Sequence, residues 1–257
     1  MKKNIFILLL LSLSFQACLV KTLMKSIGIY DKTNTIQKIS NGEKDLCFLP
    51  MHHIGKQEFY DDTKTKLDSL SKNGYYIFFE GIQGKNMVDK NQRDTLFRKL
   101  RRLTGIDLYK MGKGGGYIDS LTNESVFNNS IIDNRIKKDK LVNQPASLRK
   151  TNDTTLGRGA DASLTEMITK YETKYGKVVL NENDFNIPLG EKYDRTKGEK
   201  ISKEKRKYLI LDIRNEEIAN QIYNSTNKKI VLVCGKNHFD GLLEALKKLD
   251  NKFEAVK

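Results

Sequence analysis

Short apolar runs that alternate with amphipathic stretches constrain the fold of this chain more than any other feature. Residues 229–234 form the clearest run, and they lead through a short polar stretch into a helical pattern of leucines. Residues 46–51 and 75–79 are two further runs, with an amphipathic stretch at 57–72 between them. A strand–helix–strand unit of about 35 residues has the size of a βαβ crossover. The alternation predicts an α/β fold with a mostly parallel or mixed central sheet flanked by helices.

The remaining elements follow from the same periodicities and from capping signals. Ser163 and Glu166 match an S-x-x-E capping box, which predicts a helix that continues to Lys174. Residues 105–160 are the least regular part of the chain, and their glycine-rich stretch at 112–116 indicates a flexible turn because it lacks the spacing of a phosphate-binding loop. We also expect helices at 91–103 and 200–224, a short strand at 177–180, an edge strand at 253–256, and a hairpin through 27–30 and 35–39.

The first residues have the pattern of an export signal. Two lysines precede an apolar run at 5–13, which is too short to span a bilayer and has the length of a signal-peptide core. Ala17 directly before Cys18 resembles the cleavage site of a bacterial lipoprotein, and an ordinary cleaved signal is the alternative. We therefore expect an exported protein, tethered to a membrane of the cell envelope (periplasm or cell surface) by a lipid on Cys18. The predicted organisation is a signal peptide at 1–17, a lipid-anchored linker at 18–44 and one α/β domain at 45–257.

The chain is basic, with a formal charge of +14 from 46 Lys+Arg and 32 Asp+Glu. The basic residues are dispersed and mostly lysine, and their short clusters lack the recognition helix and interleaved aromatics of nucleic-acid-binding proteins. We expect no nucleic-acid partner and a solvated lysine-rich surface. Attraction to anionic lipid headgroups near the tether is the other role open to this charge. No pattern encodes an oligomeric state.

All three histidines follow predicted strands. His52 and His53 come just after the apolar run at 46–51. Glu80 directly follows the run at 75–79, and His238 stands shortly after the run at 229–234. Ligands of open α/β sheets bind outside the carboxyl ends of the strands, so parallel neighbours would bring His53, Glu80 and His238 to one edge. Two imidazoles and a carboxylate suit a divalent ion such as Mn, Co or Zn with open positions for water. A water bound there could act as the nucleophile of a hydrolytic reaction.

Four short motifs lie at these strand ends and on the helix at 200–224. They are Pro50-Met-His-His-Ile-Gly55, Phe78-Phe-Glu-Gly-Ile82, Arg214-Asn-Glu-Glu-Ile-Ala-Asn-Gln-Ile222 and Gly235-Lys-Asn-His-Phe-Asp-Gly241. In order and spacing they resemble the TraB/PrgY/GumN/Tiki family, which shows G-T-x-H, E-G or E-x-D, R-N and G-x-x-H-x-x-G in this sequence. The resemblance covers about residues 45–90 and 205–250, and the first motif departs from the family in having Pro50-Met51 in place of Gly-Thr.

The resemblance implies an erythromycin esterase/ChaN-like fold and a metal-dependent hydrolase of Tiki type that acts on a peptide or protein. By position, His53, Glu80, Arg214 and His238 would be the catalytic residues, with His53, Glu80 and His238 as the metal ligands and His52 as a substrate contact. Arg214 would hold a substrate carboxylate or orient Glu80. A salt bridge that clamps the helix of Arg214 to the sheet is an equal alternative.

Two other functions stay open. The first is a non-catalytic lipoprotein that captures haem, a metal or a peptide at the same edge. The second is a metal-independent hydrolase in which His53 or His238 acts as the base with Glu80. Each uses the same residues, so the sequence alone does not separate them.

Asp161, Cys47 and Cys234 complete the candidates. Asp161 lies between a polar stretch and a predicted helix start, so we expect a helix cap first and a site residue second. The two cysteines lie inside apolar runs and are expected to be buried thiols. An inter-strand disulfide between them is the alternative, provided that their Cα atoms are suitably spaced.

Overall fold

The computed structural model of the chain describes residues 19–82, 89–114, 116–119, 125–126, 129–149, 158–193 and 200–256. The predicted signal peptide and Cys18 lie outside these residues. Within them, no helix combines the length and the apolar character needed to cross a bilayer.

The strands form a mixed sheet. They are β1 (Gln37–Ser40), β2 (Asp45–Met51), β3 (Ile54–Gly55), β4 (Tyr76–Phe79), β5 (Val142–Asn143), β6 (Arg158–Gly159), β7 (Lys229–Gly235) and β8 (Glu254–Val256). Six of these described strands share one sheet in the order β6-β4-β7-β2-β1-β8, and β3 pairs with β5. β6, β4, β7 and β2 pair in parallel, whereas β1 is antiparallel to both neighbours. The predictions of an α/β fold and of the edge strand near the C-terminus are confirmed.

Helices are present in the segments where the sequence predicts them, and in several further segments. They are α2 (Gln57–Lys72), α3 (Lys90–Thr104), α4 (Leu108–Gly114), α5 (Ser130–Lys138), α6 (Leu164–Tyr175), α7 (Glu182–Asn186), α8 (Lys203–Lys207), α9 (Ile213–Asn224) and α10 (Phe239–Leu249), and residues 19–26 are also helical. Ser163 caps α6, and Glu166 returns the hydrogen bond, so the predicted capping box is confirmed.

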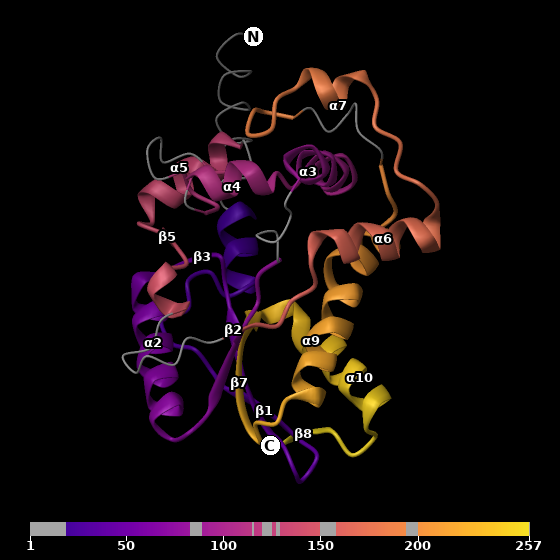
Figure 1. Ribbon diagram of the computed structural model, residues 1–257. Coiled ribbons are helices and arrows are strands. Elements are labelled where there is room, and N and C mark those ends of the chain that lie inside the picture. Colours follow the sequence, from indigo (N-terminus) through magenta and orange to yellow (C-terminus); the bar gives the residue numbers. More distant parts are fainter. Residues whose placement is uncertain are drawn as a thin grey trace.

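Both faces of the sheet are covered by helices (Figure 1). α2 covers one face, where Leu67 packs in a cluster with Val231 of β7. α9 and α10 cover the other face, where Ile218 and Leu246 pack with Leu232. Successive residues of a strand point to opposite faces, so β7 buries apolar side chains on both sides. This explains why residues 229–234 are continuously apolar rather than alternating.

A layer of helices lies over the carboxyl ends of the parallel strands (Figure 1). Its main cluster joins Leu100 of α3 and Met167 of α6 to Leu209, which lies between α8 and α9. A smaller cluster joins Met24 of the first helix to α5 and to Ile54 of β3. The least regular part of the sequence thus contributes α4 and α5 to this layer.

The predicted linker at 18–44 is instead part of the domain. Residues 19–26 are helical, and Met24 packs in the smaller cluster. β1 pairs with β2 and β8, and its Ile39 is fully buried. The predicted hairpin is wrong as well, because residues 27–30 form a turn that ends the first helix. Single apolar residues in a polar stretch were enough to anchor this segment.

Two further local predictions are wrong. Residues 177–180 belong to no strand, although Val178 is buried in the cluster around α6 and Val179 is exposed. One inward and one outward valine therefore imitated the alternation of a strand. The glycine-rich stretch predicted as a turn begins inside α4, which ends at Gly114.

The long helix predicted at 200–224 is confirmed from Lys203 and contains one wide turn. α8, a π-helical turn at Tyr208–Asp212 and α9 follow one another without a break. A π turn closes hydrogen bonds over five residues instead of four, and such turns are frequent at functional sites. Arg214 lies two residues after this turn, and its Nη1 donates to the Ile210 carbonyl at 3.2 Å.

Candidate functional site

Three neighbouring parallel strands place the predicted site residues at one edge of the sheet. β4, β7 and β2 are adjacent and parallel, so their carboxyl ends meet. Glu80 directly follows β4, and its backbone N–H donates to the Val233 carbonyl of β7 at 2.9 Å. His53 and His238 follow the ends of β2 and β7. The predicted convergence at this edge is therefore present.

Arg214 of α9 binds two carboxylates at this edge. Its Nη2 lies 2.5 Å from Glu80 Oε1 and 2.5 Å from Asp161 Oδ2, and its Nε lies 2.9 Å from Asp161 Oδ1. Asp161 also accepts from the backbone N–H groups of Gly81 and Ala162. The result is a charged triad of one guanidinium and two carboxylates, which we call the arginine triad (Glu80, Asp161 and Arg214).

The arginine triad is almost closed to solvent. The side chains of Arg214, Glu80 and Asp161 are 8%, 11% and 0% exposed. Burial alone would raise the pKa of Glu80, but the charge of Arg214 and the nearby His238 outweigh it and hold that pKa well below its usual range. Burial opposes the charge of Arg214 too, and the two carboxylates more than reverse this and raise its pKa. Glu80 and Arg214 therefore stay ionised, in a triad of two carboxylates and one guanidinium.

His238 is fixed by a neighbour of Arg214. Its Nδ1 lies 2.7 Å from Asn215 Oδ1, and its Nε2 lies 3.5 Å from Glu80 Oε1. An amide oxygen only accepts hydrogen bonds, so Nδ1 carries a proton and Nε2 faces the carboxylate. A side chain at Gly241 would collide with the Asn215 amide. This collision gives the last glycine of the fourth motif a physical reason.

The second oxygen of Glu80 is also engaged. The backbone N–H of Gly235 donates to Oε2, and the Cys234 thiol donates to the same carboxylate. A Cβ on Gly235 would lie 3.1 Å from Oε2, which is tighter than an ordinary contact. The glycine thus allows the strand end to approach the carboxylate closely. Burial, and then the charge of Glu80, raise the pKa of the Cys234 thiol well above its usual value.

His53 is accessible to solvent and is held by residues of the least regular region. Its ring stacks on Tyr117, with centroids 4.6 Å apart and planes 11° from parallel. Gln144 bonds the His53 side chain, and its backbone N–H donates to the His53 carbonyl at 2.9 Å. Desolvation by the surrounding protein lowers the pKa of His53 in spite of the attraction of Glu80. The imidazole is therefore neutral at pH 7.

Asn143 places Tyr117 over the histidine. Its side chain accepts from the Ile118 N–H at 2.8 Å and donates to the Ile118 carbonyl at 2.6 Å. Asn143 also pairs with Ile54 in the β3–β5 ribbon, one residue after His53. Gly116 permits this approach, because its φ is +143° and a Cβ would lie 2.8 Å from the Asn143 side chain. A ribbon of two short strands thereby joins Tyr117 to His53.

His52, the predicted substrate contact, is directed elsewhere. Its ring lies 5.2 Å from that of Phe59 and close to Gly28. Burial lowers its pKa, and Asp31, near the first helix, is the carboxylate that opposes this shift. His52 therefore contacts the N-terminal segment, while His53 is the histidine whose pKa responds to the charges of Glu80 and Arg214.

The predicted metal-ligand set of His53, Glu80 and His238 does not assemble in this arrangement. Among the described residues, the donor atoms that lie within 4.8 Å of one another belong to Glu80, Cys234 and His238. Both Glu80 oxygens already accept hydrogen bonds, and one of them touches the Arg214 guanidinium. A divalent ion on that oxygen would lie against the buried guanidinium of Arg214. These residues do not fit a metal centre in their present positions.

The geometry corrects the expectation for Asp161 and confirms the one for the two cysteines. Asp161 does not cap a helix, since Ser163 caps α6, and Asp161 instead belongs to the arginine triad. Cys47 and Cys234 are both free and buried, as expected for structural thiols. They pack in the clusters on opposite faces of the sheet, which excludes a disulfide between them.

Tyr117, Asn143 and Asn215 are site residues that sequence reasoning missed. Asn215 stands inside the Arg214 motif, so the motif contained it, but its partner His238 is only brought near by packing of α9 beside α10. Tyr117 and Asn143 stand in the irregular region, where nothing in the sequence singles out one polar or aromatic residue from another.

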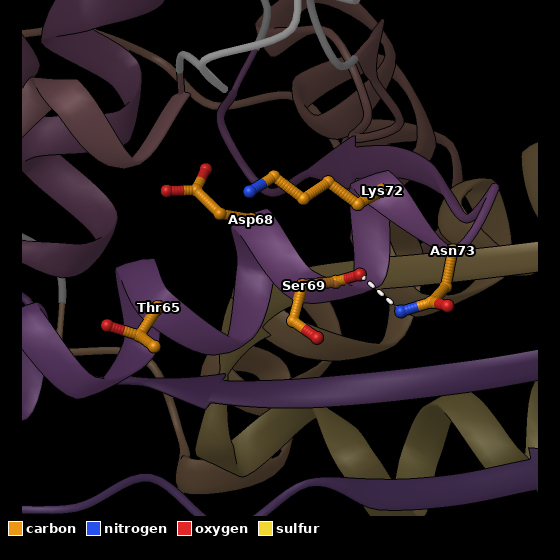
Figure 2. A pocket seen from close by; sticks show the side chains of 5 residues that line it. All are labelled: Thr65, Asp68, Ser69, Lys72 and Asn73. Carbon is orange, nitrogen blue, oxygen red and sulfur yellow. Dashed lines mark hydrogen bonds between the residues drawn. The ribbon is translucent and has the colours of Figure 1, made fainter.

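An open pocket lies elsewhere, on the outer side of α2 (Figure 2). α2 runs from the carboxyl end of β2 back to the amino end of β4, so the second half of the helix lies far along the sheet from Glu80. The Asn73 amide in this pocket donates to the Ser69 carbonyl at 2.8 Å. The pocket is lined by one polar helix surface and has no link to the arginine triad; its residues are Thr65, Asp68, Ser69, Lys72 and Asn73.

Comparison with family models, with curated proteins and with solved structures gave no match to this chain.

Proposed function

We propose that this protein is an exported, lipid-tethered hydrolase of amide or ester bonds, with a peptide as the first substrate class and a histidine rather than a metal as its base. The observation that carries this proposal is the position of His53, a neutral and accessible imidazole beside a buried, permanently charged triad. The four motifs that resemble the TraB/Tiki family, within the erythromycin esterase/ChaN-like fold, support the same reaction class. The lipoprotein-like N-terminus supports the cell envelope as its location.

His53 is the group that takes a proton from water. A general base must be neutral, reachable by solvent and fixed in orientation, and Tyr117 and Gln144 provide the last condition. When His53 takes up a proton, the ionised carboxylate of Glu80 stabilises the imidazolium through space. Glu80 therefore acts as an electrostatic partner and remains ionised throughout.

His238 and Arg214 hold the charges in place. His238 is 4% exposed, and Arg214 donates to Asp161, Glu80 and a backbone carbonyl. A substrate carboxylate would have to displace these partners, so orientation of Glu80 is the role that this geometry favours for Arg214. His238 presents Nε2 to Glu80 at 3.5 Å, so it contributes to the polar surroundings that keep this carboxylate in place.

The two adjacent histidines provide a matched test. With a panel of chromogenic peptides and esters, His53→Ala is expected to lower kcat/KM by about 100-fold or more, the usual contribution of a general base. His52→Ala should change kcat/KM by only a few fold, because that ring contacts the N-terminal segment. Equal losses in the two variants would contradict the proposal.

A metal-dependent hydrolase is the second candidate, because the resemblance of the four motifs to the TraB/Tiki family implies one. Activity that survives chelation and dialysis would support the histidine base. Activity that disappears on chelation and returns with Mn, Co or Zn, together with about one ion per chain by elemental analysis, would establish the metal enzyme instead. Absence of any hydrolysis, with a Soret band on haem titration that is lost in His53→Ala, would favour the non-catalytic haem-binding lipoprotein.

A further inference from the structure

The first helix carries an exposed apolar stripe, formed by Leu19, Leu23 and Ile27. These side chains are 65%, 61% and 48% exposed. Residues four apart lie above one another on a helix, and Ile27 continues the same line into the turn that ends the helix. The stripe is thus a continuous strip of large aliphatic side chains that face solvent.

The stripe is not a fraying end that failed to pack. The neighbouring side of the same helix is docked, since Val20 and Met24 join the cluster of Ile54, Ile118 and α5. The helix is therefore held in one orientation, with its second apolar side turned outward. The other exposed large apolar residues of the described chain lie on separate elements; they are Tyr109, Val179, Phe185, Tyr223, Leu249 and Val256.

The neighbouring sequence identifies what covers the stripe. Leu19 directly follows Cys18, and the apolar run at 5–13 stands a few residues further upstream. A helix rises about 1.5 Å per residue, so the whole stripe lies within roughly 15 Å of Cys18. A lipid on that cysteine would hold the stripe at the bilayer surface. The positive charge of the chain, with exposed Lys21 and Lys25 on this helix, complements anionic headgroups.

We propose that the helix at 19–26 lies in the membrane interface, with the stripe of Leu19, Leu23 and Ile27 at the boundary between headgroups and acyl chains. An amphipathic helix that lies in the interface adds its buried apolar area to the binding of a lipid anchor. The domain is then held in a fixed orientation instead of moving freely on a flexible tether. The proposal depends on the predicted tether at Cys18, and it is independent of the proposed hydrolysis.

The docked helix connects the membrane to the candidate site. Its Met24 packs in the cluster that contains Ile54 and Ile118. Ile54 follows His53, and Ile118 follows Tyr117, so the membrane contact and the stacked pair share one packed unit. The site would then face a constant direction relative to the bilayer.

The test uses the full chain in vesicles of phosphatidylethanolamine and phosphatidylglycerol. Single substitutions (Leu19→Cys, Lys21→Cys, Leu23→Cys, Lys25→Cys and Ile27→Cys) each carry an environment-sensitive fluorophore, and nitroxide-labelled lipids act as quenchers. Cys47 and Cys234 are buried, and the unsubstituted chain measures any background labelling. Val179→Cys is the matched control, because Val179 is an exposed apolar residue on another element.

Several-fold stronger quenching at positions 19, 23 and 27 than at 21, 25 and 179 would support the proposal. Equal quenching at all five helix positions would overturn it, because a tether alone brings the whole helix near the bilayer. Fluorophores at 19, 23 and 27 that are already shielded from water without vesicles would also overturn it, and would identify a second copy of the chain as the occupant.

Discussion

Two buried arginines of this molecule are held in different ways. Arg214, at the sheet edge, is bound by the carboxylates of Glu80 and Asp161. Arg101 of α3 is fully buried and is bound mainly by backbone carbonyls, those of Asp184, Ile187 and Pro188, at 2.8 to 3.1 Å. The ring of Tyr193 covers its guanidinium at 4.6 Å.

The difference separates a structural cation from a chemical one. Carbonyl groups have no charge and do not titrate, so the three close partners of Arg101 hold the segment around α7 to α3 without a proton to gain. The one carboxylate that the structure places beside Arg101, that of Asp107, lies farther away, at 3.4 Å from Nη1. The partners of Arg214 are ionisable, and they adjoin His238 and the accessible His53. A change of charge on these carboxylates is therefore felt by the neighbouring histidines. Loss of the contacts of Arg101 only loosens the segment around α7.

Arg214→Met should have the largest effect on stability. The variant leaves Glu80 and Asp161 buried without a counter-charge, and we expect the free energy of unfolding to fall by about 3–5 kcal/mol. Urea denaturation at pH 7 measures this loss. Part of it should return as the pH is lowered, because protonation removes the uncompensated charges. A loss below about 1 kcal/mol would mean that the triad is solvated, and the comparison would fail.

Arg101→Met should have the next largest effect, about 2–3 kcal/mol, since three carbonyls lose a charged donor. Acid should restore little of this loss, in contrast to Arg214→Met, because a carbonyl has no proton to gain. Arg93→Met is the control, as Arg93 forms only a partly exposed pair with Asp94, and it should change stability by less than about 0.5 kcal/mol. Equal recovery of both buried variants in acid would break the distinction.

The pH dependence of the unmodified protein tests the ionised state of Glu80. Its pKa is lower in the folded chain than in the unfolded one, so the unfolded state binds a proton first as the pH falls. The stabilisation is therefore complete above the unfolded pKa of about 4.3 and is lost as the pH falls toward the folded value. Glu80→Gln should remove this part of the acid dependence. Parallel stability curves for the two proteins below pH 5 would contradict the assignment.

Gly241→Ala should act on the site through Asn215. The added methyl group collides with the Asn215 amide that holds His238, and overpacking of this kind costs about 1–3 kcal/mol. Hydrolytic activity should fall by more than the loss of folded protein explains, because His238 loses its fixed orientation. Gly112→Ala is the matched control, since Gly112 also lies in a helix but has open space around it. That variant should be neutral or slightly more stable.

The smallest expected effect is a change in the pKa of His53. This pKa is measured from the NMR shift of the His53 ring during a pH titration. Tyr117→Ala uncovers the ring, so its lowered pKa should rise toward the ordinary value of about 6.5. Tyr117→Phe keeps the stacked ring and should leave the pKa close to that of the unmodified protein. A pKa that does not move in Tyr117→Ala would show that other neighbours desolvate His53.

The sheet and the ends of its strands could be predicted because their signals are local. Residues 46–51, 75–79 and 229–234 are largely apolar on both sides, and an ionisable residue of the site follows each of them within four residues. The assumption that these strands are parallel neighbours was enough to predict that Glu80 and His238 lie close together. No knowledge of side-chain contacts was needed. The α2 boundaries followed from its amphipathic pattern in the same way.

The parts that could not be predicted depend on contacts distant in sequence. Asp161 meets Arg214 across 53 positions, and Asn143 meets Ile118 through both of its side-chain groups. A buried polar contact leaves no periodicity, so Tyr117 could not be distinguished from ordinary loop residues, and Asp161 could be named as a candidate but its partner Arg214 could not. The predicted strand around Val178 and Val179 failed in the opposite way. Its alternation of burial is real, but the described residues include no strand that pairs with it.

The wide turn at Tyr208–Asp212 makes this helix unequally sensitive to a change of length along its course. Successive residues of an α-helix are rotated by about 100° around its axis. A π turn holds one residue more than an α-helical turn, so removal of one residue there would leave ordinary winding and nearly the same rotational phase between α8 and α9. The regular winding of α9 has no such extra residue, so a deletion there would rotate one part of the helix away from the helical layer or from the carboxylates of Glu80 and Asp161. A single-codon deletion in the wide turn should therefore do less damage than the same deletion within α9.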